Sequence, residues 1–331
     1  MIAQYLDKQA ITLLLPMQDC IPVMERMFRS LAAGECLQPL RNLMWLPDKS
    51  GILGMMPGYA SGPEILGIKV ITIFHGNGAI GLPSHQGVVI LFDAKHGTPL
   101  LLLDAATLTS IRTAAASAVA TRLLARENAC RLAILGTGEQ AEQHIQAIAL
   151  VRPLTAITIW GRNPSDRRRP SDLGARPTSA AALAHKLGSL HEIPIHLASS
   201  AREAVGDADI ICTVTSSPQP ILLGEWIPEG AHVNAVGSCT PVTREVDTKA
   251  VLRSRLYTDR YESLFNEAGE FLIPKKEGFL NESFVQGEIG EVLTGAKPGR
   301  TNAADITLFK SLGIAAEDLF AARYIYDQLH P

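Results

Sequence analysis

The middle of the chain alternates short apolar runs with stretches rich in alanine. The apolar runs predict strands at Arg131–Leu135, Ala156–Trp160, 208–214, 232–237 and 255–258. The intervening stretches at 140–151 and 179–187 predict helices. Strands that alternate with helices are typical of βαβ units, so this region predicts a parallel, doubly wound sheet of the α/β class.

The first hundred residues have a different pattern. Strand-like segments at 68–74, 88–93 and 99–103 are separated by turns that carry Gly, Pro and Asn, which predicts a largely antiparallel sheet. A helix is predicted over 109–127, with Ser and Thr at its start and an alanine-rich body, and it links the two regions. Apolar residues at three- and four-residue steps predict another helix over 314–329.

Length and composition favour a soluble globular protein with two domains. The 331 residues correspond to two domains of about 150 residues each. Hydrophobic residues make up 47% and charged residues 19% of the chain, which argues against disorder. The net charge of −3 supplies no basic field for nucleic acid.

Membrane, export and metal-binding classes are also disfavoured. No apolar run approaches the roughly 18 residues that a membrane helix needs, and no basic region precedes the short N-terminal apolar stretch, so we expect no signal peptide. The five cysteines are widely spaced, which predicts reduced thiols and a cytoplasmic protein. The nine histidines form no H-E-x-x-H motif, so we expect no metal site.

A glycine-rich turn follows the first strand of the predicted parallel sheet. Residues 136–141 read G-T-G-E-Q-A and open the next helix. In this pattern the first glycine permits the tight turn, the second lets the backbone approach a pyrophosphate, and the small last residue lets the helix pack on the sheet. An ordinary glycine turn is the alternative. The context favours a dinucleotide bound by Gly136, Thr137, Gly138, Glu139 and Gln140.

The end of the second predicted strand indicates which cofactor binds. An NAD site usually places an acid there for the ribose 2′-hydroxyl, but this strand ends at Trp160 and continues with Gly161, Arg162 and Asn163. A guanidinium suits a 2′-phosphate. Arg162 and Asn163 therefore favour NADPH, with NADH as the alternative and a merely exposed Arg162 as the other interpretation.

Three cations outside this region are candidates for binding an anion. Arg112 lies near the start of the predicted linking helix, where a cation opposes the helix dipole unless an anion binds as well. Lys69 lies inside an apolar strand, where a lysine is costly unless it is paired. Arg41 precedes another apolar run. Each of them could instead be a surface residue or half of an ion pair.

Seven short segments, in this order along nearly the whole chain, resemble the ornithine cyclodeaminase/mu-crystallin family. They are Gln38-Pro39-Leu40-Arg41, Gly67-Ile68-Lys69, Pro83-Ser84-His85-Gln86, Arg112-Thr113-Ala114-Ala115, Gly136-Thr137-Gly138, Asn234-Ala235-Val236-Gly237 and Phe309-Lys310-Ser311-Leu312-Gly313. The resemblance implies a homodimer. It places a Rossmann-type NAD(P)-binding domain at 113–304 and a split α+β substrate-binding and dimerisation domain at 1–112 with 305–331.

The resemblance also implies the site residues. Arg41, Lys69 and Arg112 would line the substrate pocket and carry catalysis, with the two arginines on a carboxylate and Lys69 near an imine nitrogen. Glu262 matches an acidic pocket position. His85 would contact the cofactor, transfer a proton or serve as a structural histidine. The residues expected around the cofactor are Ser84, His85, Arg112, Thr113, Thr213, Val214, Thr215, Val236, Gly237, Ser238 and Ser311.

One departure separates the chain from part of this family. The cyclodeaminases and archaeal alanine dehydrogenases carry an Asp just after the Val-Gly turn, where this chain has Cys239. A neutral thiol cannot pair with a substrate ammonium, so the chain looks most like the mu-crystallin-like ketimine reductases. These would reduce Δ1-pyrroline-2-carboxylate to proline, or Δ1-piperideine-2-carboxylate to pipecolate, with NAD(P)H.

Three other activities stay open at this point. They are an ornithine cyclodeaminase, an open-chain amino-acid or imino-acid dehydrogenase, and a non-catalytic protein that binds a small ligand. The ring size of the substrate is open as well.

Overall fold

The computed structural model describes residues 4–162, 179–188 and 193–331. The chain divides into two compact units, a first unit of Met1–Ala116 with Gly313–Pro331 and a second unit of Ser117–Leu312. These bounds differ from the expected ones at 113–116 and 305–312. The second difference has a clear cause, because strand β15 (Ile306–Lys310) is hydrogen-bonded between two strands of the second unit.

The described residues of the first unit form a seven-stranded sheet. Its order is β1-β7-β6-β5-β4-β2, with β3 also paired to β4, and its pairs are antiparallel except β1 with β7. The predicted strands at 68–74, 88–93 and 99–103 lie in β5, β6 and β7. The strand bounds are β1 Gln4–Leu6, β2 Cys36–Leu37, β3 Asn42–Trp45, β4 Ile52–Ala60, β5 Ile65–Ile73, β6 His85–Asp93 and β7 Pro99–Asp104.

The C-terminal helix packs on this sheet. Helix α11 (Ala315–Leu329) contacts β4 to β7 and helix α2 (Met17–Ala32), so the helix predicted over 314–329 is confirmed. The other helical elements of the first unit are α1 (Lys8–Leu14) and the short η1 (His75–Ile80).

Helix α3 (Ala105–Leu124) begins in the first unit and ends in the second. The bounds predicted for it, 109–127, are wrong at both ends. The helix starts earlier because the Asp104 carboxylate, and not a Ser or Thr at 109–110, accepts a hydrogen bond from the first turn, at 2.8 Å from Thr107 N. This earlier start places Arg112 in the second turn, beyond the first-turn position assumed for it.

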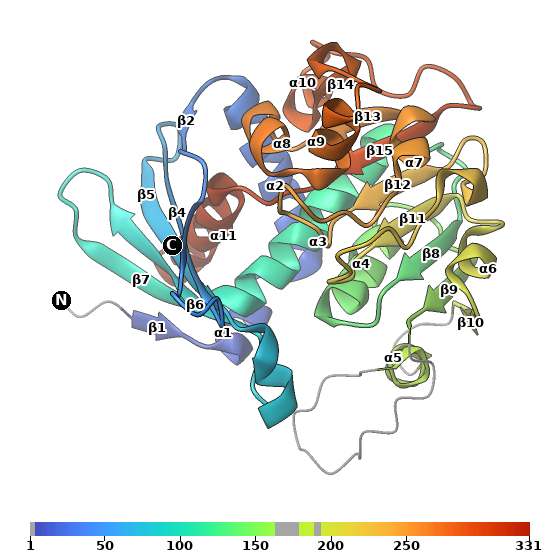
Figure 1. Ribbon diagram of the computed structural model, residues 1–331. Helices are drawn as coiled ribbons and strands as arrows, with labels where there is room; N and C mark the ends of the chain where they lie inside the picture. The colour runs from blue at the N-terminus through green and yellow to red at the C-terminus, as the bar shows by residue number, and fades with distance from the viewer. Residues whose placement is uncertain (1–3, 163–178, 189–192) are drawn as a thin grey trace. The chain divides into compact units, whose positions relative to one another are not determined.

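The described residues of the second unit form an eight-stranded parallel sheet (Figure 1). Its order is β10-β9-β8-β11-β12-β15-β13-β14, so the chain runs outward from β8 to β9 and β10 and then returns to β11 on the other side of β8. This reversal confirms the doubly wound α/β fold. The remaining strand bounds are β8 Arg131–Leu135, β9 Ala156–Trp160, β10 Ile195–Leu197, β11 Ile210–Thr213, β12 His232–Ala235, β13 Ser254–Thr258 and β14 Val285–Glu288.

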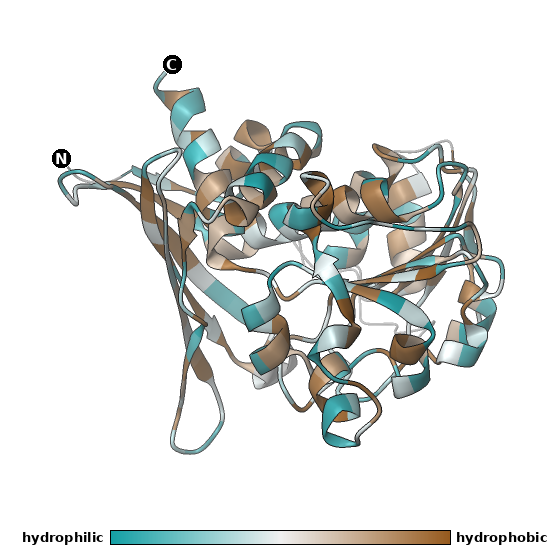
Figure 2. Ribbon diagram, turned by 90° about the horizontal axis from the view of Figure 1, so that it is seen from above, coloured by the Kyte–Doolittle hydropathy of each residue, from teal (hydrophilic) through white to brown (hydrophobic). Residues whose placement is uncertain are grey.

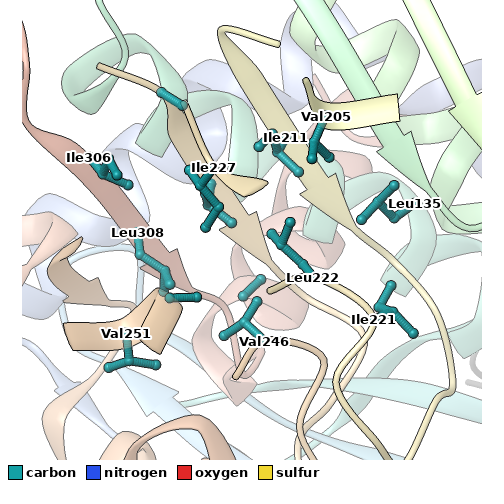
Figure 3. Packing of buried hydrophobic residues seen from close by; sticks show 14 of the residues in the cluster. Leu135, Val205, Ile211, Ile221, Leu222, Ile227, Val246, Val251, Ile306 and Leu308 are labelled. Atoms are coloured by element: carbon teal, nitrogen blue, oxygen red, sulfur yellow. The ribbon is translucent and has the colours of Figure 1, made fainter. Parts of the chain in front are cut away.

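Helices cover both faces of this sheet. On one face, Val205 of α6 (Ala201–Val205) lies near Ile211, and Val251 of α7 (Thr248–Leu252) lies near Leu308, in one apolar cluster (Figure 3). The end of α3 and helix α4 (Glu139–Ala149) cover the other face, where Asn234 donates to Thr121 Oγ1 at 3.0 Å. The strands of this sheet are largely apolar (Figure 2), as expected for a sheet buried on both sides.

The remaining helical elements belong to the second unit. They are α5 Ala180–Gly188, η2 Gly224–Trp226, α8 Tyr261–Glu267, α9 Gly269–Lys276, η3 Glu282–Phe284 and α10 Ile289–Leu293. Within the described part of the chain, no helix is long and apolar enough to cross a membrane. The same residues contain no group of three or more His, Cys, Asp or Glu side chains that could hold a metal ion.

Candidate active site

The glycine turn lies at the point where the strand order of the second unit reverses. Gly136 follows β8 with a φ of 134°, a conformation that side-chain-bearing residues rarely adopt. A Cβ at this position would lie 2.7 Å from Val214 O, so the loops after β8 and β11 are in contact here. Ligands of doubly wound sheets bind at such a switch point, beyond the carboxyl ends of the strands.

The turn leaves room for a phosphate group. Gly138 is the N-cap of α4, and none of the described atoms comes within 4 Å of the place where its Cβ would be. Two buried polar atoms of the predicted cofactor set, Gln140 Oε1 at the start of α4 and Ser311 Oγ after β15, have no hydrogen-bond partner among the described residues. Buried polar groups are normally paired, so an open turn with two unpaired polar atoms fits a bound dinucleotide.

The end of β9 meets the same turn. Gly136 N donates to Trp160 O at 2.9 Å, and Arg162 follows two residues later with an exposed side chain. An accessible guanidinium at this place is what a ribose 2′-phosphate requires. The second predicted residue, Asn163, lies outside the described residues.

A carboxylate that was not predicted joins the loops after β11 and β12. Glu245 is fully buried, and its two oxygens accept hydrogen bonds from Thr213 Oγ1 at 2.8 Å and from Thr215 N, Thr215 Oγ1 and Gly237 N at 2.6 Å each. The hydroxyl of Thr213, expected to face the cofactor, is therefore directed at Glu245. The sequence offered no signal for Glu245 beyond its acidic type.

In the first unit, Lys69 reaches its buried position because of a glycine on the same face of β5. A Cβ on Gly67 would lie 2.5 Å from both Ile90 O and a methyl group of Leu319, so only glycine lets α11 approach the strand this closely. Lys69 lies two residues further on the same face, and its ammonium is 2.6 Å from Asp318 Oδ2 of α11. The glycine-lysine spacing in the sequence thus positions the lysine beneath the helix.

Asp318 also binds Arg112, so one carboxylate joins two of the predicted site residues. Arg112 Nε donates to Asp318 Oδ1 at 2.8 Å, and Nη1 donates to Glu317. Both carboxylates are fully buried in the first turn of α11, where the helix dipole favours negative charge. Glu317 and Asp318 were missed because their partners lie about 200 residues away in the sequence.

Arg41 completes this group of charges in the first unit. Arg41 Nη2 donates to Gly313 O at 3.0 Å, and a Cβ on Gly313 would come within 2.7 Å of Arg112 Nη1, so both arginines lie at the start of α11. The amide oxygen of Gln38 accepts from Ala316 N at 2.9 Å and holds the same turn. The segment Gln38-Pro39-Leu40-Arg41 therefore contacts the beginning of α11 through both of its polar side chains.

The protonation of this cluster follows from burial and from the mutual charges. Burial lowers the pKa of Lys69 to about 8, although the neighbouring Asp318 carboxylate opposes the shift. Burial raises the pKa of Asp318, but Arg112 and Lys69 outweigh it and hold this pKa below its ordinary value. Lys69 and Arg112 thus pair with the two carboxylates Glu317 and Asp318, and Arg41 lies beside them at the start of α11.

The other predicted residues are placed as follows. Ser84 Oγ lies 2.9 Å from His85 Nδ1, on the exposed start of β6, while Thr113 is buried beside Arg112 in α3. In the second unit, Val236 N donates to Thr213 O at 3.0 Å and Ser238 Oγ donates to Thr243 O at 2.8 Å.

Comparison with known proteins identifies the family of the chain. The family model described as ornithine cyclodeaminase/mu-crystallin family matches residues 3–331. The chain belongs to this family. The mouse protein named ketimine reductase mu-crystallin is 36% identical over 294 residues, which cover 89% of this chain and 86% of the mouse protein.

Two solved structures share the fold. The structure of Thermococcus litoralis Δ1-pyrroline-2-carboxylate reductase in complex with NADH and L-proline has a TM-score of 0.89 at 34% identity, and the match covers 98% of this chain and 97% of that one. An archaeal alanine dehydrogenase dimer with bound NAD has a TM-score of 0.89 at 27% identity, with 99% and 96% covered.

Two further predicted positions lie in the second unit. Cys239 is partly buried and packs against the apolar cluster of this unit. Glu262 lies on α8, where its carboxylate accepts a hydrogen bond from Arg260 and is half exposed.

Proposed function

We propose that the chain is an NAD(P)H-dependent reductase of cyclic ketimines with a 2-carboxylate. It would reduce Δ1-pyrroline-2-carboxylate to proline and Δ1-piperideine-2-carboxylate to pipecolate, a role in proline metabolism. The observation that carries the proposal is the buried cluster in which Asp318 pairs with both Lys69 and Arg112, with Arg41 at the same helix start. The names of the mouse and Thermococcus litoralis relatives support the same reaction class.

Each residue of the cluster has a defined task in this reaction. Arg41 and Arg112 orient the substrate carboxylate, since guanidinium groups bind carboxylates in a fixed geometry. Lys69 remains an ammonium at neutral pH and keeps a nearby imine nitrogen protonated, which makes C2 a better hydride acceptor. A bound nicotinamide cofactor supplies the hydride. The nitrogen thus gains the proton and C2 gains the hydride.

The same proposal assigns NADPH as the preferred cofactor, with NADH as the alternative. It rests on Arg162, the exposed arginine after β9. Arg162→Asp should weaken NADPH binding by about 1.5–3 kcal/mol, the value of a lost charge-assisted hydrogen bond, and leave NADH binding nearly unchanged. Fluorescence titration with both cofactors measures the difference, and an equal loss for both would refute the assignment.

The deciding experiment is an assay of NADPH oxidation with each of the two cyclic imines. Steady turnover of at least one of them is expected. Ornithine with NAD⁺ is the control for a cyclodeaminase, and pyruvate with ammonia is the control for an open-chain dehydrogenase. Robust conversion of ornithine to proline and ammonia would overturn the proposal, and binding of NADPH without turnover of either imine would favour a non-catalytic binding protein.

We further propose a cytoplasmic homodimer. The five cysteines, all among the described residues, form no disulfide, which fits a reducing compartment. The consecutive large apolar residues Leu43, Met44 and Trp45 of β3 are exposed, and exposed apolar surface of this kind favours an interface. Light scattering should give about twice the chain mass of 35.6 kDa. A stable monomer with full activity would contradict the dimer.

A further inference from the structure

Glu245 is a buried carboxylate that the proposed reaction does not use. It lies between two loops at the carboxyl ends of parallel strands, the loop after β11 at 213–215 and the loop after β12 at 236–238. Its oxygens accept hydrogen bonds from two backbone N–H groups and two hydroxyl groups of these loops. A single side chain therefore sets the spacing of two segments at the edge of the sheet where ligands of this fold bind.

The donors around Glu245 are matched by its ionised form. Oε1 accepts from Thr215 N and Oε2 accepts from Gly237 N, each at 2.6 Å. A carboxylate accepts at both oxygens, so it satisfies the backbone N–H groups of both loops at once. Burial raises the pKa of Glu245, while the Thr215 hydrogen bonds and the charge of Lys310 act in the opposite direction.

A second buried pair, Lys310 and Glu270, contacts the loop after β12 as well. Lys310, at the end of β15, donates to Ala235 O at 3.2 Å and to Ser238 O, and its ammonium lies 3.4 Å from Glu270 Oε2. The other oxygen of Glu270 accepts from Glu245 N at 3.0 Å. The loop after β12 is thus hydrogen-bonded to Glu245 through Gly237 and to Lys310 through its carbonyl groups.

We propose that Glu245 is a positioning residue for cofactor binding, with Lys310 and Glu270 as its support. Through its hydrogen bonds it holds the backbone of 213–215 and 236–238 in the arrangement that receives the dinucleotide. This inference rests on the proposed function, because it assumes that the second unit binds NAD(P)H. Glu245 itself is fully buried and acts on the cofactor only through these two loops.

The test is Glu245→Gln, which keeps the shape of the side chain but turns an NH2 group toward one N–H donor. The dissociation constant of NADPH, measured by fluorescence titration, should rise at least about tenfold, which equals about 1.4 kcal/mol. The KM for NADPH should rise with it, while the KM for the imine at saturating NADPH stays within about twofold. If Glu245 only stabilised the fold, the substitution would not raise the KM for NADPH while leaving the KM for the imine unchanged.

Asp247→Asn is the matched control on the same segment. Asp247 Oδ1 accepts from Gly224 N and from Ala250 N, each at 2.8 Å, and both donors lie outside 213–215 and 236–238. Asp247→Asn should lower the melting temperature about as much as Glu245→Gln does. It should leave NADPH affinity within about twofold of the unmodified protein. An equal loss of NADPH affinity in both variants would overturn the inference.

Thr213→Val decides the question if Glu245→Gln does not fold. It removes one fully buried donor to Glu245 and should weaken NADPH binding about threefold. NADPH affinity within 1.5-fold of the unmodified protein in this variant, or within about twofold in Glu245→Gln, would refute the role of Glu245. If the unmodified protein itself bound neither NADPH nor NADH, the proposed function would fail together with this inference.

Discussion

The two units prepare their ligand-binding groups in opposite ways. In the first unit, charged side chains are buried together, with Lys69 and Arg112 on Asp318 and Arg112 also on Glu317. In the second unit, the predicted binding groups are mainly backbone atoms of loops, among them the glycine turn at 136–138, and the buried Glu245 carboxylate accepts hydrogen bonds from the loops 213–215 and 236–238.

This difference indicates which kind of substitution should disturb each unit. A buried charge cluster depends on the number of charges, because removing one partner leaves another charge buried and unpaired. A backbone turn depends on conformation and space, because a single additional carbon atom can displace it. Charge-removing and space-filling substitutions therefore test the two units separately.

The largest effect is expected in the first unit for Asp318→Asn. It leaves Lys69 and Arg112 with one carboxylate fewer in a buried site, and breaking such a pair costs about 3–5 kcal/mol in the free energy of unfolding. Asp327→Asn is the control on the same helix, because Asp327 pairs with Arg323 at 2.7 Å at the surface, where a pair is worth about 0.5 kcal/mol or less. Urea unfolding measures the free energy of unfolding of both variants. Similar losses in the two would show that the buried cluster stabilises the protein no more than a surface pair does.

The next largest effect is expected in the second unit for Gly136→Ala. The new Cβ would lie 2.7 Å from Val214 O at a φ of 134°. We expect the dissociation constant of NADPH to rise at least about 100-fold, equal to about 2.7 kcal/mol, together with a lower melting temperature.

Gly138→Ala is the partner experiment to Gly136→Ala. It meets no described protein atom within 4 Å, so the melting temperature should stay unchanged while NADPH affinity falls. Unchanged NADPH affinity in Gly138→Ala would mean that no phosphate approaches this turn.

A smaller effect is expected for the cations that we propose to be catalytic. Lys69→Ala and Arg41→Ala should each lower kcat/KM for the cyclic imine at least about tenfold, equal to about 1.4 kcal/mol of transition-state stabilisation. Cys239→Ala is the comparison in the second unit and should keep most of the activity, because reduction of an imine that is already formed needs no proton acceptor there. A loss at Cys239 as large as that at Lys69 would point back to cyclodeamination.

The smallest effect is a change in pH dependence. Because burial lowers the pKa of Lys69 to about 8, kcat/KM should decline as the pH rises through this value and the ammonium is lost. An arginine keeps its charge to far higher pH. The kcat/KM of Lys69→Arg, whatever its size, should therefore not decline in this pH range. The imine titrates identically in both assays and serves as the internal control. A decline at the same pH in both proteins would assign it to the substrate.

Local patterns predicted most strands of the second unit but left out several elements. The runs at Arg131–Leu135 and Ala156–Trp160 are short, largely apolar and each followed by a glycine, and they form β8 and β9 with the predicted bounds. Strand β4 (Ile52–Ala60) was not predicted, since Pro57 and the neighbouring glycines are unfavourable for a strand. Strand β15 was not predicted either, because it ends in Lys310, which is buried only through contacts to distant residues.

The sequence by itself determined the α/β class and the glycine turn at 136–138, and it indicated Arg41, Lys69 and Arg112 as candidate site residues. These features depend on neighbouring residues, or on motifs whose order along the chain is readable. Only the tertiary structure decided that Asp318 joins Lys69 to Arg112 and that Glu245 joins two loops. Such partners are brought together by helix and strand packing across long stretches of chain, and an acidic residue alone does not indicate which donors the fold will place around it.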